Sequence, residues 1–271
     1  MKECRLYHTG MLTTEDGMLQ GNHVFLVGEN GRLLPPEEIW CAKVDCDNRL
    51  IQFEVDGKWG FADISTGEIK IQPQWDFVGP FYGKYAHVAN GVQVTINWNC
   101  RGMPQLSEGG KHGYIDVNGN PAIPLIYEDA KDYPENDYYR EETYLFSVRQ
   151  DGKWGLIDCQ NKSIIPFSFL EISGTVNSNF YLTAIETSRG IRYGVYSRSC
   201  EELIETVIDE LPQLIRLPKA PEVFINYETL TYYYVKTGRR FGVISSDGRM
   251  ITDLTLLKKD AVALIKKLNG Y

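Results

Sequence analysis

No long apolar run occurs in the sequence, and basic residues are too few to dominate its charge. No stretch reaches the roughly 18 apolar residues of a membrane-spanning helix, and the N-terminal stretch MKECRLYHTGMLTTEDG contains no apolar core of a secretory signal. We therefore expect a cytoplasmic protein that does not bind membranes. Phosphate binding requires concentrated Lys and Arg, so the net charge of −8 argues against nucleic acid as a partner.

Strong catalytic and metal-binding motifs are missing as well. The sequence contains no Walker A loop, no Gly-x-Ser-x-Gly and no His-Glu-x-x-His. Its six cysteines are scattered and form neither a zinc pattern nor a disulfide framework, and its four histidines form no ligand pattern. We therefore expect no catalytic residue, no metal and no cofactor.

The sequence does contain an internal repeat. The pentapeptide DGKWG occurs at 56–60 and again at 151–155. Searching outward from it gives five copies of a core made of a basic residue, an aromatic residue, glycine and an apolar residue. The copies are KWGF at 58–61, KHGY at 111–114, KWGL at 153–156, RYGV at 192–195 and RFGV at 240–243. His112 takes the aromatic position of the second copy, which indicates a flat packing residue instead of a base or a ligand.

The surroundings of each core predict a β-hairpin. Alternating strands precede the core at 50–55, 144–150 and 232–236. Asp-Gly at 56–57 and 151–152 predicts a tight turn, and Gly109-Gly110 is expected to do the same in the second copy. Three residues after the core glycine lies Asp or Ser, which starts a further turn. Apolar segments at 69–75, 122–127 and 164–169, each with a proline, then close the first three units.

The chemistry of the core explains why units must stack. The glycine allows a neighbouring backbone or ring to approach where any Cβ would collide. The aromatic residue before it buries roughly 150–250 Å². A unit of two or three strands cannot bury its own apolar face, so neighbouring units are expected to pack on each other. Trp59 and Trp154 are therefore predicted to be packing residues.

This pattern resembles the WG (KWG) repeat family of bacterial β-repeat proteins. The stretches 56–75 and 151–169 match the family pattern closely, whereas the copies at 109–127, 190–204 and 238–251 lack the Trp. The resemblance implies a repeat array used for binding or scaffolding. It implies no shared activity and no catalytic residue.

We predict an all-β fold of tandem β-hairpin WG repeats in an open curved stack, closed by a C-terminal capping helix. Residues 1–21 form an N-terminal segment, 22–252 the array of one degenerate unit plus five units, and 253–271 the helix. The alternative is a six-unit β-propeller, because a period of about 40–45 residues also suits propeller blades. Four strands per unit in a ring would favour the propeller, and two or three in an open superhelix would favour the stack.

The predicted C-terminal helix has one apolar stripe. Asp253 is its candidate N-cap, and Lys266 and Lys267 lie in its last turn, where the helix dipole favours cations. The stripe consists of Leu254, Leu257, Ala261, Leu264 and Leu268.

Two interruptions of the repeat are the candidate binding surfaces, because function on a repeat scaffold concentrates in insertions. The first, at 90–110, carries Trp98 and Arg101 and suits carbohydrate or peptide recognition; the alternative is a long hairpin that packs its Trp on a neighbour. The second, at 127–144, is rich in tyrosines and carboxylates and suits a basic protein partner; the alternative is a solvated loop. Its candidate contact residues are Tyr133, Glu135, Asp137, Tyr138, Tyr139, Glu141 and Glu142.

These observations predict a non-catalytic scaffold that binds an unidentified protein partner, a basic one in the simplest case, as an immunity or adaptor protein does. One alternative is a carbohydrate- or cell-wall-binding module that uses Trp98. Another is an enzyme with a site between repeats. The sequence does not indicate an oligomeric state.

Overall fold

The computed structural model describes fourteen stretches of the chain: residues 2–7, 12–14, 17–19, 23–27, 33–34, 50–63, 68–97, 103–106, 109–131, 144–174, 180–210, 213–214, 232–246 and 249–268. The chain forms two compact units. Unit 1 comprises Met1–Asp151 and Ile157–Lys162, and unit 2 comprises Gly152–Leu156 and Ser163–Tyr271.

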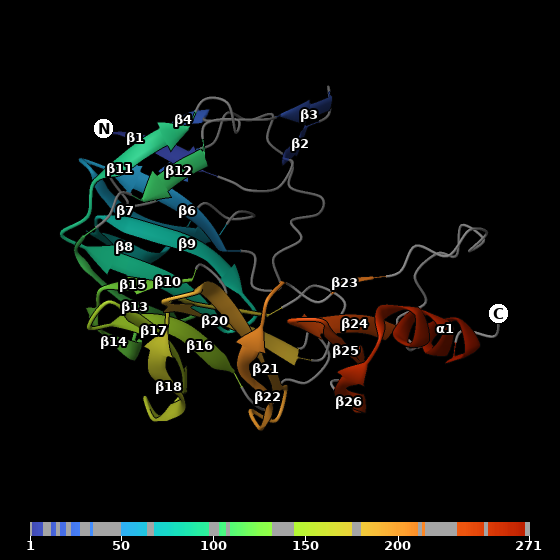
Figure 1. The fold of residues 1–271 in the computed structure, drawn as a ribbon. Helices are drawn as coiled ribbons and strands as arrows, with labels where there is room; N and C mark the ends of the chain where they lie inside the picture. The colour runs from blue at the N-terminus through green and yellow to red at the C-terminus, as the bar shows by residue number, and fades with distance from the viewer. Residues whose placement is uncertain are drawn as a thin grey trace. The chain divides into compact units, whose positions relative to one another are not determined.

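Unit 1 begins with a six-stranded sheet in the order β5-β4-β1-β6-β7-β8 (Figure 1). Its strands are β1 (Lys2–Tyr7), β4 (His23–Val27), β5 (Leu33–Leu34), β6 (Leu50–Val55), β7 (Lys58–Asp63) and β8 (Ile69–Trp75). β1, from the predicted N-terminal segment, pairs with both β4 and β6. A separate hairpin pairs β2 (Leu12–Thr14) with β3 (Gly17–Leu19).

The second sheet of unit 1 has the order β14-β13-β10-β9. Its strands are β9 (Phe77–Tyr82), β10 (Tyr85–Asn90), β13 (Lys111–Asp116) and β14 (Pro121–Tyr127). Between β10 and β13 the chain forms an antiparallel pair of β11 (Val94–Asn97) and β12 (Met103–Leu106). The predicted two-residue turn at Gly109-Gly110 is therefore wrong, because the two strands of this hairpin are joined by the whole first interruption.

Three further four-stranded sheets follow, and each has its strands in sequence order. The first contains β15 (Asp129–Ala130), β16 (Leu145–Gln150), β17 (Lys153–Asp158) and β18 (Ser163–Phe169), and its residues belong to both units. Unit 2 then contains β19 (Glu171–Gly174), β20 (Phe180–Thr187), β21 (Gly190–Ser197) and β22 (Glu202–Ile208). The last sheet contains β23 (Gln213–Leu214), β24 (Tyr232–Thr237), β25 (Arg240–Ser245) and β26 (Met250–Leu256), and the helix α1 (Lys258–Leu268) follows it.

Each repeat sheet after the first thus has four strands, where two or three were predicted. The additional strand directly follows the closing strand of the preceding unit. A single residue separates β8 from β9 (Asp76), β14 from β15 (Glu128) and β18 from β19 (Leu170). The continuous apolar pattern hid this break, because one extended segment serves two sheets in succession.

Three boundaries near the C-terminus also differ from the prediction. The closing strands β22 and β26 were not predicted in the fourth and fifth copies, which lack the proline of the first three. The helix begins at Lys258, so Asp253 lies in β26 and is not an N-cap. The segment MITDLTL alternates with period two, and this alternation places it in a strand despite the leucine stripe that continues into the helix.

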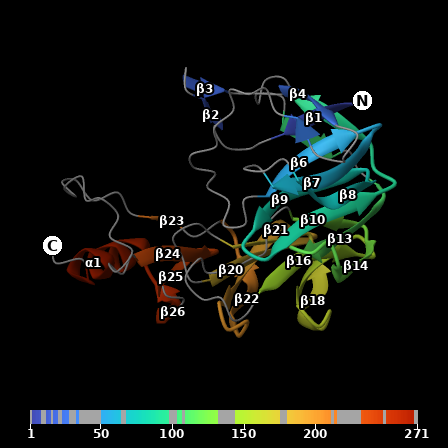
Figure 2. The ribbon, with the colours of Figure 1, turned by 180° about the vertical axis from the view of Figure 1, so that it is seen from behind.

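The apolar cores lie between successive sheets within each unit, as the stacking argument predicted. In unit 1, Trp59, Phe61 and Trp75 pack with Val78 and Phe81 of the next sheet, and the Phe61 and Phe81 ring centroids are 4.6 Å apart. In unit 2, a corresponding cluster joins Phe180, Leu182, Val195, Ile204 and Ile208 to Val235 and Ile244. Figures 1 and 2 show the paired sheets of each unit side by side from opposite directions.

The helix covers one face of the last sheet. Ala261 and Ile265 are buried against Phe241 and Val243, and Leu264 packs at the margin of this cluster. Ala261 and Leu264 of the predicted stripe thus face the sheet, whereas Leu257 and Leu268 are exposed. The all-β class, the tandem hairpin repeats and the C-terminal capping helix are confirmed.

Candidate functional site: the junctions between sheets

The core glycine of each copy lies beneath a neighbouring strand. At Gly60, an added Cβ would lie 2.5 Å from the Ile71 carbonyl oxygen and 2.7 Å from the Pro73 nitrogen. At Gly113, the same atom would lie 2.5 Å from the Ile123 carbonyl oxygen. The closing strand shifts its register here, so its backbone crosses directly over the glycine. The predicted close approach is confirmed. Its partner is backbone at Gly60, Gly113 and Gly242, whereas the Phe167 ring lies nearest at Gly155 and the Thr183 hydroxyl nearest at Gly194.

The aromatic residue before the glycine pairs with the last residue of the closing strand. Trp59 lies opposite Trp75, and His112 lies opposite Tyr127. The same register recurs where Tyr193 pairs with Ile208 and Phe241 with Leu256. Trp59 and His112 are buried, and Trp154 is half-buried.

The basic residue of the core forms a junction between sheets that the sequence reasoning did not identify. The Lys58 ammonium donates to the carboxylate of Asp76, the single residue between β8 and β9, over 2.5 Å. The other carboxylate oxygen accepts the Gly91 amide, from the hairpin of the next sheet, over 2.6 Å. The Asp76 amide in turn donates to the Ala89 carbonyl oxygen. The bond from Lys58 and those from the backbone outweigh burial and lower the pKa of Asp76.

The junction recurs with the same geometry in unit 2. Asp209 follows β22, and its carboxylate accepts from the Arg192 guanidinium and from the Gly238 amide in the next hairpin. Its own amide donates to the Lys236 carbonyl oxygen. We call each set of acid, basic side chain and hairpin amide a junction clamp. The signal in the sequence was a carboxylate one residue after each of these closing strands, in WDF and IDE.

Two other copies use the basic residue differently. Lys111 donates to the Ile126 carbonyl oxygen over 3.2 Å, and Arg240 donates to the Thr255 carbonyl oxygen over 3.0 Å. These two acceptors occupy the same repeat position, one residue before the partner of the core aromatic residue. In four of the five copies the basic residue therefore binds either the end of the closing strand or the acid that follows it.

The polar residue after the core starts a turn, as predicted. Asp116 Oδ1 accepts the amides of Asn118 and Asn120, each over 2.9 Å. Asp158 accepts the amides of Gln160 and Lys162 in the same way. These bonds lower the pKa of Asp116 although burial alone would raise it. The repeated carboxylates are therefore structural.

The one histidine in a core position forms a buried pair. The nearest ring nitrogens of His87 and His112 are 3.0 Å apart, and the other ring nitrogen of His112 lies 3.0 Å from the Gly109 carbonyl oxygen. If His112 Nε2 donates to this carbonyl, its Nδ1 accepts from His87. Both rings are buried, and burial lowers the pKa of His112. The packing interpretation of His112 agrees with this position.

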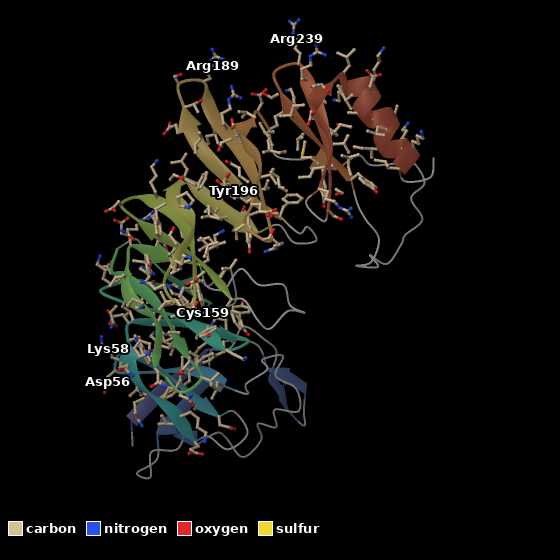
Figure 3. All side chains as sticks on the ribbon, turned by 90° about the horizontal axis from the view of Figure 1, so that it is seen from below. Asp56, Lys58, Cys159, Arg189, Tyr196 and Arg239 are labelled. Carbon is tan, nitrogen blue, oxygen red and sulfur yellow. The ribbon has the colours of Figure 1, made fainter. Side chains whose placement is uncertain are left out.

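Cys159 and Tyr85 form a second polar contact within unit 1. The Tyr85 hydroxyl donates to the Cys159 sulfur over 3.8 Å, and burial raises the pKa of Tyr85 to about 12. The thiol itself donates to the Tyr144 carbonyl oxygen over 3.6 Å. Figure 3 marks the position of this cysteine. Within the described stretches no three His, Cys, Asp or Glu side chains are grouped to hold a metal ion.

The candidate contact residues all fall outside the described stretches. They are Trp98, Arg101, Tyr133, Glu135, Asp137, Tyr138, Tyr139, Glu141 and Glu142. Trp98 and Arg101 lie in the sequence between β11 and β12, which pair as antiparallel strands within the first interruption. The second interruption is bounded by Lys131 and Tyr144.

Both boundaries of the second interruption are fixed to the structure. The Lys131 amide donates to the Ser147 carbonyl oxygen, and the Tyr114 hydroxyl donates to the Lys131 carbonyl oxygen. Tyr144 is buried, and its ring lies 4.7 Å from that of Tyr85. The residues on either side of 132–143 are thus held at defined points of unit 1. No helix in the described residues is long and apolar enough to cross a membrane.

Comparison with known proteins identifies the repeat. No curated protein matches the sequence. Similar solved structures include a crystal structure of the eukaryotic initiation factor, with 10% identity over 94% of this chain and 74% of that one and a TM-score of 0.38. A protein of unknown function from Bacteroides caccae has 10% identity over 96% of both chains and a TM-score of 0.22. Similarity at this level assigns neither fold nor function.

The family comparison matches the positions of the cores. Residues 59–91 and 113–154 match the model of the WG containing repeat. These segments begin at Trp59 of the first core and at Gly113 of the second. These two segments are therefore WG-containing repeats, as the motif resemblance predicted.

Proposed function

We propose that this chain is a non-catalytic scaffold that binds a basic protein partner, as an adaptor or immunity protein does. The observation that carries the proposal is the structural use of the recurring polar groups, since the basic residue forms a structural contact in four of the five cores. The basic residues bind junction acids or closing-strand carbonyls, as Lys58 and Arg240 do, and the turn acids bind backbone amides, as Asp116 does. The groups that do not recur from copy to copy and that suit a partner lie in the two interruptions of the repeat.

The second interruption is the favoured contact surface. Between Lys131 and Tyr144 the sequence DYPENDYYREET has five carboxylates, one arginine and three tyrosines. Tyrosine supplies contact area at low entropic cost, and the carboxylates suit cationic side chains. Its two boundaries are anchored in unit 1. Such anchoring limits the conformational entropy that binding must overcome.

The charge of unit 1 supports a basic partner. Met1–Asp151 together with Ile157–Lys162 contains 24 Asp and Glu and 14 Lys and Arg, a difference of −10. An acidic surface steers a cationic protein toward it and raises the association rate at low salt. Cytoplasmic location belongs to the same proposal.

Affinity capture with a charge-neutralised variant tests this proposal. The test variant combines Glu135→Gln, Asp137→Asn, Glu141→Gln and Glu142→Gln. The tagged wild-type chain should retain a near-stoichiometric basic protein that dissociates as salt rises. The variant should lose this protein while keeping the wild-type melting temperature.

A second variant controls for total charge by removing four carboxylates elsewhere. It combines Asp56→Asn, Glu68→Gln, Asp151→Asn and Glu171→Gln. Asn is well tolerated at the positive φ of Asp56 and Asp151, so folding should be preserved. Equal loss in both variants would attribute binding to net charge alone. If the test variant retained the partner protein fully, residues 132–143 would not form the contact surface. If the wild-type chain captured no protein, the scaffold proposal would be contradicted.

A further inference from the structure

The hairpin tips change the sign of their charge along the chain. The tips of the first and third hairpins carry Asp56-Gly57 and Asp151-Gly152, with both residues at positive φ. A turn of this kind favours Asp or Asn followed by Gly. In the fifth hairpin the glycine comes first, as Gly238 at φ 55, and the next tip residue is Arg239.

The fourth hairpin also carries an arginine at its tip. Thr187 pairs with Gly190, which leaves Ser188 and Arg189 at the centre of the turn. Both tip arginines of unit 2 are exposed. Figure 3 shows Arg189 and Arg239 extending outward from their hairpins.

The junction clamp of unit 2 connects these two hairpins. Asp209 accepts from Arg192, two residues beyond the fourth turn, and from Gly238, the residue before Arg239. The adjacent Glu210 forms an ion pair with Lys236. These two carboxylates, Asp209 and Glu210, therefore already have cationic partners. Consequently they offset little of the charge of Arg189 and Arg239.

The start of the helix extends this basic region. Since β26 runs antiparallel to β25 and Leu256 lies opposite Phe241, the chain enters α1 at the tip end of the fifth hairpin. Lys258 and Lys259 are the first residues of the helix, and both are exposed. Arg240 is also exposed and reaches the Thr255 carbonyl oxygen beside them.

We call the resulting surface the basic rim. It consists of Arg189, Arg239, Arg240, Lys258 and Lys259. The exposed carboxylates on the same elements are Glu186 and Asp260, so cations outnumber them. Residues 232–271 contain eight Lys and Arg against three Asp and Glu, whereas residues 1–231 contain 20 against 33. The last sheet and helix are thus the basic part of an acidic chain.

We propose that the basic rim binds an acidic polypeptide segment of a second partner. Arginine and lysine at protruding tips reach carboxylates on an extended chain, and arginine binds them in bidentate geometry. Nucleic acid is the less favoured ligand, because phosphate binding requires a higher concentration of Lys and Arg than the five residues of the rim supply. This surface is opposite in charge to the one proposed above and does not depend on it.

A titration with an acidic peptide tests the proposal. The probe is a fluorescently labelled peptide of about ten glutamates, followed by anisotropy at about 50 mM salt, where charge screening is weak. The test variant combines Arg189→Glu, Arg239→Glu and Lys259→Glu, and none of these side chains has a contact described in the structure. We expect this variant to bind the probe at least about tenfold more weakly, since three exposed attractions become repulsions.

The matched control makes the same change in net charge at three lysines that are not part of the rim. It combines Lys84→Glu, Lys153→Glu and Lys162→Glu, which are all exposed. The control should bind the probe within about twofold of the wild type. Equal weakening in both variants, or no binding by the wild type, would overturn the proposal. Tighter binding of single-stranded DNA of about 20 nucleotides than of the peptide would replace the acidic polypeptide with nucleic acid.

Discussion

The Lys58 ammonium lies 2.5 Å from the Asp76 carboxylate and thereby ties the first core to the residue that leads into the next sheet. Arg192 and Asp209 repeat this relationship in unit 2. The basic residue of the WG core therefore has a structural role that involves more than its own hairpin. It holds the end of the closing strand where the chain passes between sheets.

Removing the acid of the clamp should destabilise unit 1. Asp76→Ala eliminates the acceptor of both Lys58 and the Gly91 amide. Because Lys58 is half exposed, we expect a loss of only about 1 kcal/mol in the free energy of unfolding, measured by urea denaturation at neutral pH. Lys70→Ala is the control: it removes the ion pair of 2.7 Å with Glu68 on the exposed face of β8, and should cost less than about 0.5 kcal/mol.

The same variant has a defined pH dependence. The pKa of Asp76 is lowered in the folded protein, so the unfolded state binds more protons in acid. The stabilisation by this carboxylate is present above its ordinary pKa and is lost as pH falls through the folded value. The difference between wild type and Asp76→Ala should therefore shrink below about pH 4. A difference that stays constant below that pH would show that Asp76 acts by packing alone.

Glycine substitutions should rank by the distance to the closing-strand backbone. Gly60→Ala places a Cβ 2.5 Å from the Ile71 carbonyl oxygen, and we expect a cost of about 1–3 kcal/mol. Gly242→Ala meets its nearest backbone atom at 3.0 Å and should cost less. Thermal melts of the two variants test this ranking. The reverse order would mean that the closing strand of the first copy is free to move away.

The repeat could be predicted from sequence because its signals are local. The turn at Asp56-Gly57, the aromatic residue and the glycine each act within one hairpin. The fourth strand could not be predicted, since β8 and β9 form one extended run that is divided only at Asp76. The division depends on which sheet pairs with each half, and pairing is not a local property.

The polar contacts between units of the repeat were equally hidden. Lys58 and Asp76 are 18 residues apart, and Asp209 and Gly238 are 29 residues apart. Period-two alternation indicates which face of a strand is buried, but it does not give the register between distant strands. The candidate contact residues in the two interruptions stay predictions.

Acid should destabilise unit 1 through His112. Burial lowers its pKa from the ordinary value of about 6.5. The neighbouring His87 and Arg149 act in the same direction, while the hydrogen bond to the Gly109 carbonyl oxygen and the charge of Asp129 oppose them. The unfolded state then binds more protons, so stability is lost as pH falls below about 6.5. His112→Phe, which puts an aromatic ring of the fifth core at this position, should flatten the dependence between about pH 7 and pH 5. An unchanged slope would assign the acid sensitivity to other groups.

The packing of the helix α1 on the last sheet should depend more on Ile265 than on the exposed Leu257. Ile265 is 1% exposed and packs with Ala261 against Phe241 and Val243, so Ile265→Ala leaves a cavity where the helix meets the sheet. We expect a loss of about 2–5 kcal/mol in the free energy of unfolding of unit 2, followed by urea denaturation. Leu257 is 48% exposed just before the helix, and Leu257→Ala should cost less than about 0.5 kcal/mol. Equal losses from the two variants would mean that the helix is held mainly by its entry point and not by its buried face.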